Sequence, residues 1–314
     1  MIDLIIPSYN AYDTIERTLL SVLAQSIKDK VKVYIVDDAS SKSYDYLIDL
    51  FGKYLDINII KLDKNVGPGL SREEAIKRTN SKYIIFLDSD DLLYSYDSLE
   101  ILFNEIDKGY DYVSTREFDE KKDEIIQING NLHGKIYRRS YLEKNNIHFN
   151  DTRYHEDNYF NNLVRLCTSN YVHIDDVCSY IYTYNKNSIT NKDDKEFDRL
   201  EIYLKNMKDI LDNKDHKEYN INEMYLFKLE KYNYLSSLLS RYDSKKREKL
   251  IKWYHIYDDD YFKYEGLKGD ELAKKLYRDE FRGKIDFKLL ESHLIEVNIN
   301  NKWYSWMILN YLLL

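Results

Sequence analysis

Short apolar runs alternate with helix-like segments through the first 110 residues, and this alternation restricts the fold more than any other feature. Four runs have the length and composition of buried strands, and each is followed by a segment with apolar residues at helical spacing. The runs are DLIIPSY (3–9), KVYIVDD (32–38), INIIKLD (57–63) and KYIIFLD (82–88). Because strands that alternate with helices form a mostly parallel sheet with helices on both faces, the sequence predicts an α/β fold.

The alternation weakens after about residue 112. A fifth strand is predicted at 110–115 and further strand material at 171–185, whereas the pattern from residue 194 onward is helical. We place a boundary near residue 192, inside the polar stretch NSITNKDDKE. The sequence therefore predicts an α/β domain over 1–192 and a helical C-terminal domain over 193–314.

Charge and cysteine content argue against a broad nucleic-acid-binding face and against a cysteine metal site. The net charge of −8 argues against a broad nucleic-acid-binding face, which needs a basic surface. The two cysteines show no metal-ligand spacing, which favours free thiols in a reducing cytoplasm.

The N-terminus does not resemble a signal peptide, and no apolar run approaches the ~20 residues that span a bilayer. The apolar ending WYSWMILNYLLL favours a docked helix, and contact with a membrane surface or a partner is the alternative.

Three carboxylates crowd the end of the fourth predicted strand, at Asp88, Asp90 and Asp91. Like charges ~4 Å apart repel by about 1 kcal/mol even in the dielectric of water. A solvated turn is one explanation, since Asp and Ser favour turns. The other is a bound Mg²⁺ or Mn²⁺, which takes carboxylate ligands and phosphate oxygens. Because alternate residues of an extended chain point the same way, Asp88 and Asp90 are the predicted ligands.

Three further segments have side chains suited to binding or proton transfer. The second predicted strand ends in Asp37 and Asp38, which can accept hydrogen bonds from a base or ribose. The stretch NVGPGLSRE predicts a tight turn into a helix that Ser71 and Glu74 cap, and Arg72 there could hold a phosphate. YHEDNYF places two acids in a first helical turn, where they also complement the helix dipole.

The order of these segments resembles glycosyltransferase family 2, the inverting nucleotide-sugar transferases of GT-A fold. The resemblance covers about residues 1–190 and rests on PSYN, VDDAS, NVGPGLSRE, LDSDD and HEDNYF. It implies a GT-A (Rossmann-like) catalytic domain over 1–192. It also implies transfer of a sugar from a nucleotide diphosphate to a hydroxyl group, with a cation stabilising the leaving diphosphate and a carboxylate accepting the hydroxyl proton.

The resemblance also implies roles for individual residues. Asp157 corresponds to the general base, and Glu156 to a residue that binds the acceptor or orients the site. Asp90 would bind the metal directly, with Asp88 as its second ligand. Residues 133–142 resemble the acceptor side, and residues 182–190 the stretch that contacts the diphosphate. Glu73 replaces a frequent Asn, and His173 is a candidate late metal ligand, although a core or surface histidine is the favoured interpretation. The implied nucleotide-sugar-binding residues are Pro7, Tyr9, Asn10, Asp37, Asp38, Gly67, Arg72, Asp88, Ser89 and Asp91.

We therefore expect a metal-dependent inverting hexosyltransferase that uses Mn²⁺ or Mg²⁺ and a UDP-sugar. The expected acceptor is a bacterial cell-surface polymer or glycan, reached in the cytoplasm or at the inner face of the membrane, and the C-terminal helices could form a homo-oligomer. One alternative is a phage enzyme that acts on modified DNA bases or on protein, with a local basic groove from Lys135, Arg138 and Arg139. The other is a catalytically inactive nucleotide-sugar-binding module, which the intact Asp88, Asp90 and Asp157 disfavour.

Overall fold

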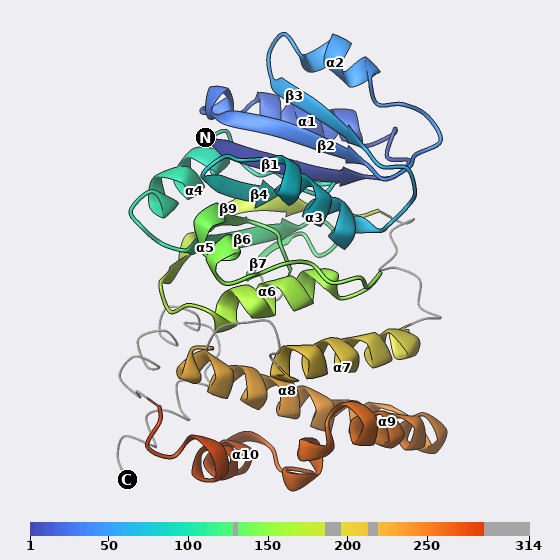
Figure 1. Cartoon of the computed structure of the whole chain (residues 1–314), viewed down its shortest axis with the longest axis vertical. Coiled ribbons are helices and arrows are strands. Elements are labelled where there is room, and N and C mark those ends of the chain that lie inside the picture. Colours follow the sequence, from blue (N-terminus) through green and yellow to red (C-terminus); the bar gives the residue numbers. More distant parts are fainter. Residues whose placement is uncertain (128–130, 186–195, 213–218, 286–314) are drawn as a thin grey trace. The chain divides into compact units, whose positions relative to one another are not determined.

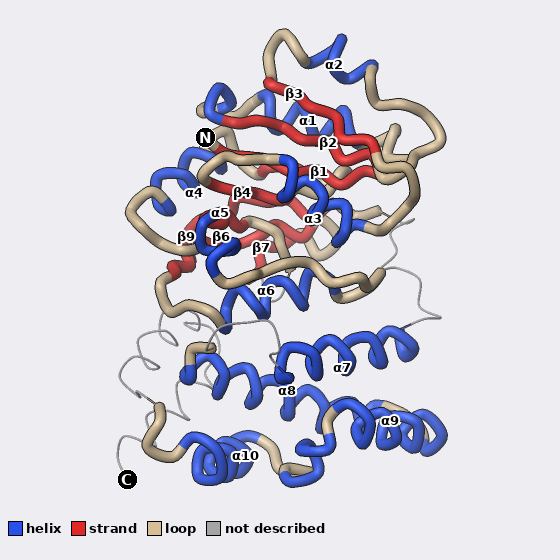
Figure 2. The backbone as a smooth tube through the Cα atoms, in the orientation of Figure 1, coloured by secondary structure: helices blue, strands red, loops and turns tan. Residues whose placement is uncertain are grey.

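The computed structural model describes residues 1–127, 131–185, 196–212 and 219–285 (Figures 1 and 2). The chain divides into two compact units. One comprises Met1–Asn161 with Asn170–Glu196, and the other Asn162–Ser169 with the chain from Phe197 onward. The boundary predicted near residue 192 lies outside the described residues, so the limits 1–192 and 193–314 stay a prediction.

Within the described residues, the first unit is built on one nine-stranded sheet (Figure 2). The strands run in the spatial order β3-β2-β1-β4-β8-β6-β9-β5, with β7 paired to β6. The neighbours β3, β2, β1 and β4 are parallel, as are β6 and β9, and the other pairs are antiparallel. The predicted α/β class is confirmed, and the sheet is mixed. The strands are β1 (Ile2–Ser8), β2 (Val31–Asp37), β3 (Asp56–Lys61), β4 (Tyr83–Phe86), β5 (Leu92–Leu93), β6 (Tyr112–Asp119), β7 (Glu124–Gln127), β8 (Lys135–Arg138) and β9 (Tyr171–Tyr182).

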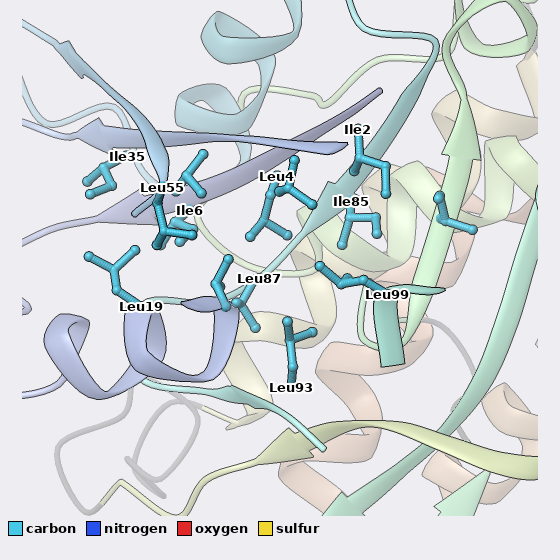
Figure 3. Packing of buried hydrophobic residues seen from close by; sticks show 14 of the residues in the cluster. Ile2, Leu4, Ile6, Leu19, Ile35, Leu55, Ile85, Leu87, Leu93 and Leu99 are labelled. Carbon is cyan, nitrogen blue, oxygen red and sulfur yellow. The ribbon is translucent and has the colours of Figure 1, made fainter. Parts of the chain in front are cut away.

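Helices cover both faces of this sheet. On one face, alternate β1 residues such as Leu4 and Ile6 pack with Leu19 and Leu99 from two helices (Figure 3). On the other face, the Phe86 ring of β4 lies edge-on to Phe160. Each apolar side chain buried in this way stabilises the fold by roughly 1.5–3 kcal/mol. The helices of this part of the chain are α1 (Ile15–Leu23), α2 (Tyr46–Phe51), α3 (Pro68–Arg78), α4 (Ser98–Ile106), α5 (Arg139–Lys144) and α6 (Glu156–Leu166), with a 3₁₀ turn at Lys28–Lys30.

The N-cap of helix α3 lies four residues before the predicted cap, Ser71. This N-cap is Gly67, with φ +89°, and Pro68 occupies the first helical position, where its fixed φ suits a helix start. Ser71 therefore lies inside the helix, and the predicted capping box is wrong. Glu74 pairs instead with Lys77 and Arg78 on the exposed face of α3.

In the described residues of the second unit, all the elements are helical, as predicted. Asn220 caps α8 through its side-chain oxygen, and Asp243 caps α9 in the same way. Leucine and tyrosine side chains form most of its core. The predicted helix at 286–297 and the apolar ending at 303–314 lie outside the described residues. The helical elements are α7 (Glu196–Asp212), α8 (Ile221–Arg241), α9 (Ser244–Tyr257) and α10 (Gly269–Leu276), with short turns at Asp259–Lys263 and Tyr277–Phe281.

Across the described residues, none of the helices combines the length and the apolar character needed to cross a membrane.

Candidate active site

The predicted nucleotide-binding residues gather where β1 and β2 end. Pro7 is buried within β1, next to Val36 of β2, whereas Tyr9 is 55% exposed. Asn10 has a φ of +53°, and its Oδ1 accepts hydrogen bonds from the backbone N–H and the hydroxyl of Ser41. These contacts tie the two loops together and leave an exposed aromatic ring beside them.

Asp37 and Asp38 are both buried and both bind backbone groups. Asp37 accepts a hydrogen bond from the N–H of Ser40. The two carboxylate oxygens of Asp38 accept from the N–H groups of Val66 and Gly67, at 2.7 and 2.9 Å. In this structure Asp38 therefore fixes the glycine turn that opens α3, and its contact with a nucleobase stays a prediction.

The acidic turn after β4 is braced from α1. Thr18 donates to the carbonyl of Ser89, and Arg17 donates to the carbonyl of Asp90. These two side chains of α1 therefore hold the backbone of the acidic turn at Ser89 and Asp90. The Asp90 carboxylate is partly exposed and accepts a hydrogen bond from the Asn185 side chain at 2.9 Å. Arg17 was not among the predicted site residues.

Asp91 differs from its neighbours because it is buried and bonded through both oxygens. Tyr180 donates its hydroxyl to Oδ2 at 2.7 Å, and the N–H of Thr183 donates to Oδ1 at 2.8 Å. Burial, together with the charges of Asp88 and Asp90 and against that of His133, raises the pKa of Asp91 to about 8. The side chain joins the acidic turn to the end of β9.

Arg72 connects the acidic turn to the start of α6. Its Nη2 donates to Oδ1 of Asp88 at 2.5 Å, and its Nη1 lies 3.4 Å from Oε1 of Glu156. The Arg72 side chain is 5% exposed, and in the described part of the chain its Nε has no hydrogen-bond partner. Burial alone would raise the pKa of the Asp88 carboxyl, but Arg72 and His133 outweigh burial and hold that pKa below its ordinary value.

The start of α6 approaches α3 so closely that Gly69 is required there. A Cβ atom at this position would lie 2.7 Å from Cγ of Glu156. Burial and the neighbouring Asp157, opposed by Arg72, raise the pKa of Glu156 to about 7. Asp157 is half-buried in the first helical turn, where its Oδ1 accepts the N–H of Asn158. The two adjacent acids therefore occupy different environments.

A histidine that sequence reasoning had placed only in the acceptor-side segment belongs to this site. The Nε2 atom of His133 lies 3.7 Å from Oδ2 of Asp88 and 3.9 Å from Oδ2 of Asp91, and one ligand atom from each residue falls within 4.8 Å of the other two. Among the described residues this is the group that could hold a metal ion. It shares Asp88 with the predicted ligand pair, and the role of Asp90 as a ligand stays a prediction.

His173, the predicted candidate for a late metal ligand, does not belong to that group. It lies on β9, where Nδ1 is 2.9 Å from the Ser114 hydroxyl and Nε2 is 3.4 Å from Asp175. Gly67 closes the turn before α3, as predicted, and Ser89 contributes its carbonyl to the braced turn. Of the diphosphate-contacting stretch predicted at 182–190, residues 186–190 lie outside the described part of the chain.

The family description "Glycosyl transferase family 2" matches residues 3–158, a stretch that includes Arg72, the acidic turn and Asp157. Over this stretch, the chain belongs to glycosyl transferase family 2. The resemblance inferred from the sequence motifs is thereby confirmed.

The chain aligns with its curated relatives over parts of their length. It is 38% identical over 92 residues to the putative teichuronic acid biosynthesis glycosyltransferase TuaG of Bacillus subtilis, covering 29% of this chain and 36% of TuaG. It is 38% identical over 97 residues to the poly(ribitol-phosphate) beta-glucosyltransferase of Bacillus spizizenii, covering 30% of this chain and 15% of that protein. The chain thus spans about a third or less of the first relatives it matches.

The fold is shared more completely than the sequence. The Staphylococcus aureus TarS 1–349 structure in complex with UDP-GlcNAc superposes with a TM-score of 0.71 at 18% identity, covering 93% of this chain and 91% of that one. The mannosyltransferase PcManGT from Pyrobaculum calidifontis, in complex with GDP-Man and Mn²⁺, gives a TM-score of 0.51 at 13% identity. The chain therefore has the GT-A fold with a helical C-terminal region, as expected.

Proposed function

We propose that this glycosyltransferase transfers a sugar, with inversion, from a UDP-sugar to a hydroxyl of a bacterial cell-surface polymer. The observation that supports it best is the chain of contacts from Asp88 through Arg72 to Glu156, because it joins the predicted donor side to the predicted acceptor side. The relatives support the acceptor class, since their names include poly(ribitol-phosphate) and teichuronic acid glycosyltransferases.

The donor side of the proposal rests on the loops at the ends of β1, β2 and β4. The exposed Tyr9 ring offers a surface on which a base can stack, and Asn10 holds the neighbouring loop in place. The unpartnered Nε–H of Arg72 is a buried cationic donor, suited to a phosphate oxygen. Asp88 and Ser89 are the proposed neighbours of the ribose, and Asp91 of the donor sugar.

The residues of the acidic turn fit a divalent cation. One ligand atom each from Asp88, Asp91 and His133 lies within 4.8 Å of the others. The ligands predicted from the sequence are Asp88 and Asp90, and Asp90 stands between Asp88 and Asp91 in the acidic turn. Oxygen ligands suit Mg²⁺ and Mn²⁺, and imidazole favours the transition metal of the two. When bound there, such an ion would neutralise charge on the leaving diphosphate.

The acceptor side of the proposal rests on Asp157 and Glu156. A sugar hydroxyl is a poor nucleophile, so a carboxylate within hydrogen-bond reach must accept its proton as the new bond forms. Asp157 is the proposed base, because its partial exposure leaves it accessible to an acceptor. Glu156 faces inward to Arg72 and orients the site. One displacement then inverts the anomeric carbon, with no covalent intermediate on the protein.

The test is a transfer assay with a panel of nucleotide sugars and purified poly(polyol phosphate) acceptors. We expect transfer from a UDP-sugar in Mn²⁺, and its loss in EDTA with recovery when Mn²⁺ is restored. In Mn²⁺, the Asp90→Ala variant should bind the donor more weakly than the wild-type protein does. In EDTA, the two proteins should bind the donor equally. Undiminished transfer in EDTA would exclude the metal, and binding of donor without transfer to any acceptor would favour a binding module instead.

The same proposal includes a cytoplasmic location, contact with the inner face of the membrane and pairing of two copies through the C-terminal helices.

A further inference from the structure

His133 reaches the acidic turn through the register of an antiparallel pair. In the β4–β8 pair, Ile84 lies opposite Tyr137 and Ile85 opposite Ile136. Extending this register by three residues along each strand places position 133 opposite position 88. The neighbouring β6 continues the arrangement, because it pairs with β8 on its other side and includes Glu117. Strand β6 and the turns that adjoin β4 and β8 therefore bring an imidazole and two carboxylates together.

The His133 ring is held by contacts that fix its orientation. It stacks on the Tyr180 ring at a centroid distance of 4.3 Å and 5° between planes, and Tyr182 stacks at 5.5 Å. The adjoining Gly134 has a φ of +57°, and a Cβ atom there would lie 2.7 Å from the hydroxyl of Thr115. The loop that presents the ring thus lies tightly against β6.

The two ring nitrogens of His133 have different neighbours. Nδ1 lies 2.6 Å from Oε2 of Glu117, and the side-chain amide nitrogen of Asn131 lies 3.1 Å from this Nδ1. The Glu117 contact is shorter and involves a carboxylate, which can only accept, so Nδ1 carries a proton. Nε2 faces Asp88 and Asp91.

We propose that His133 is a nitrogen ligand of the metal ion and that Glu117 is the positioning residue that presents it. Metal-binding histidines almost always donate their second ring N–H to a carboxylate or carbonyl, which fixes the tautomer and the ring plane. Glu117, His133 and Asp88 show this arrangement within one cluster. The inference rests on the proposed function, since it concerns the same cation. It adds a ligand that neither the sequence motifs nor the matched family names assign.

Electron spin echo spectroscopy of Mn²⁺ bound to the full chain, with UDP present, tests the proposal directly. Coordination by imidazole couples the ¹⁴N nucleus to the manganese electrons, whereas oxygen ligands produce no such signal. We expect the ¹⁴N modulation in the wild-type protein and in His173→Gln, and its loss in His133→Gln. Glu117→Gln should retain a weakened signal and lower Mn²⁺ affinity roughly 10- to 100-fold, the usual cost of losing an outer-sphere partner. Thermal melting verifies that each variant is folded.

The outcomes separate this inference from the proposed function. Bound Mn²⁺ without ¹⁴N modulation in the wild-type protein overturns the role of His133 and leaves the cation in place on oxygen ligands. A signal that disappears in His173→Gln and persists in His133→Gln assigns the nitrogen to the other histidine and likewise overturns the inference. Failure of the wild-type protein to bind Mn²⁺ with or without UDP overturns both the ligand and the metal-dependent reaction.

Discussion

Arg72 donates a hydrogen bond of 2.5 Å from Nη2 to Oδ1 of Asp88, although the two residues belong to different elements of the fold. Arg72 lies on α3, and Asp88 lies just beyond the end of β4. The same guanidinium also reaches Glu156 at the start of α6. One buried cation thus holds together three segments of the candidate active site.

Replacing Arg72 by Met should destabilise the protein by about 3 kcal/mol, because two largely buried carboxylates lose their shared partner. Urea denaturation at neutral pH measures this. The matched control is Arg78→Met on the exposed side of the same helix, where the change should stay within about 0.5 kcal/mol. Equal effects of the two substitutions would show that the buried contacts add nothing to stability.

Gly69→Ala should destabilise the protein by roughly 1–3 kcal/mol, because the added methyl group overlaps Glu156 and forces α3 away from α6. Ser71→Ala, two residues along the same helix, is the control. Its hydroxyl is buried and has no hydrogen-bond partner among the described residues, so its removal should leave stability unchanged or raise it. A Gly69→Ala protein as stable as the wild type would contradict the close approach of the two helices.

Asp157→Asn should lower the rate of transfer by at least about 100-fold while leaving nucleotide-sugar affinity nearly intact, since a general base acts on the acceptor proton. Steady-state kinetics and calorimetric donor binding give the two quantities. Asp151→Asn is the control, because it makes the same chemical change at an exposed position before α6. Normal turnover in the Asp157 variant would require another base.

Glu156 should make the wild-type protein less stable as pH rises from 4.5 to 7. Its pKa is about 7 in the fold against 4.5 as the ordinary value, so the folded state retains the proton more tightly than the unfolded state. This contribution is complete below pH 4.5 and disappears as pH passes 7, with a span of about 3 kcal/mol. Urea denaturation at pH 5 and pH 7.5 should show the loss in the wild type and a smaller one in Glu156→Gln. Parallel profiles for the two proteins would refute this account.

The helical unit has its own buried ion pair, in which Nζ of Lys231 lies 2.5 Å from Oδ2 of Asp258. Asp258→Asn should destabilise this unit by roughly 3–5 kcal/mol, because it leaves a buried ammonium without its counter-charge. The double replacement Lys231→Met with Asp258→Leu should recover most of that loss. All three tryptophans lie beyond residue 252, so their fluorescence during urea unfolding monitors this part of the chain. If the double variant is no more stable than Asp258→Asn, the loss of stability does not come from the unpaired ammonium alone, and the two side chains are also needed for packing.

The sequence by itself determined the α/β class, the four parallel strands and the positions of the main acidic residues. It could do so because these features are local: a buried strand is a continuous apolar run, and the residues that follow it lie at the edge where parallel strands end. Asp38 and Asp88 were therefore placed at that edge without the fold, and their roles in binding stay predictions. The start of α3 was misplaced because Gly67 and Pro68 define a helix start as well as Ser71 does, and a capping pattern alone cannot choose between them.

Tertiary structure alone decided which side chains face one another across the sheet. The antiparallel return of β8 beside β4 brings His133 to Asp88, and β6 brings Glu117 to His133. The four residues of β8, Lys135–Arg138, indicate neither the neighbouring strand nor the direction of β8. The register of a strand pair depends on the sequences of both strands and on which of their faces are buried. The sequence of one strand alone therefore does not specify it. The division of Asp88, Asp90 and Asp91 into an arginine-bound, a partly exposed and a fully bonded carboxylate has the same origin, because each environment is built by residues distant in sequence.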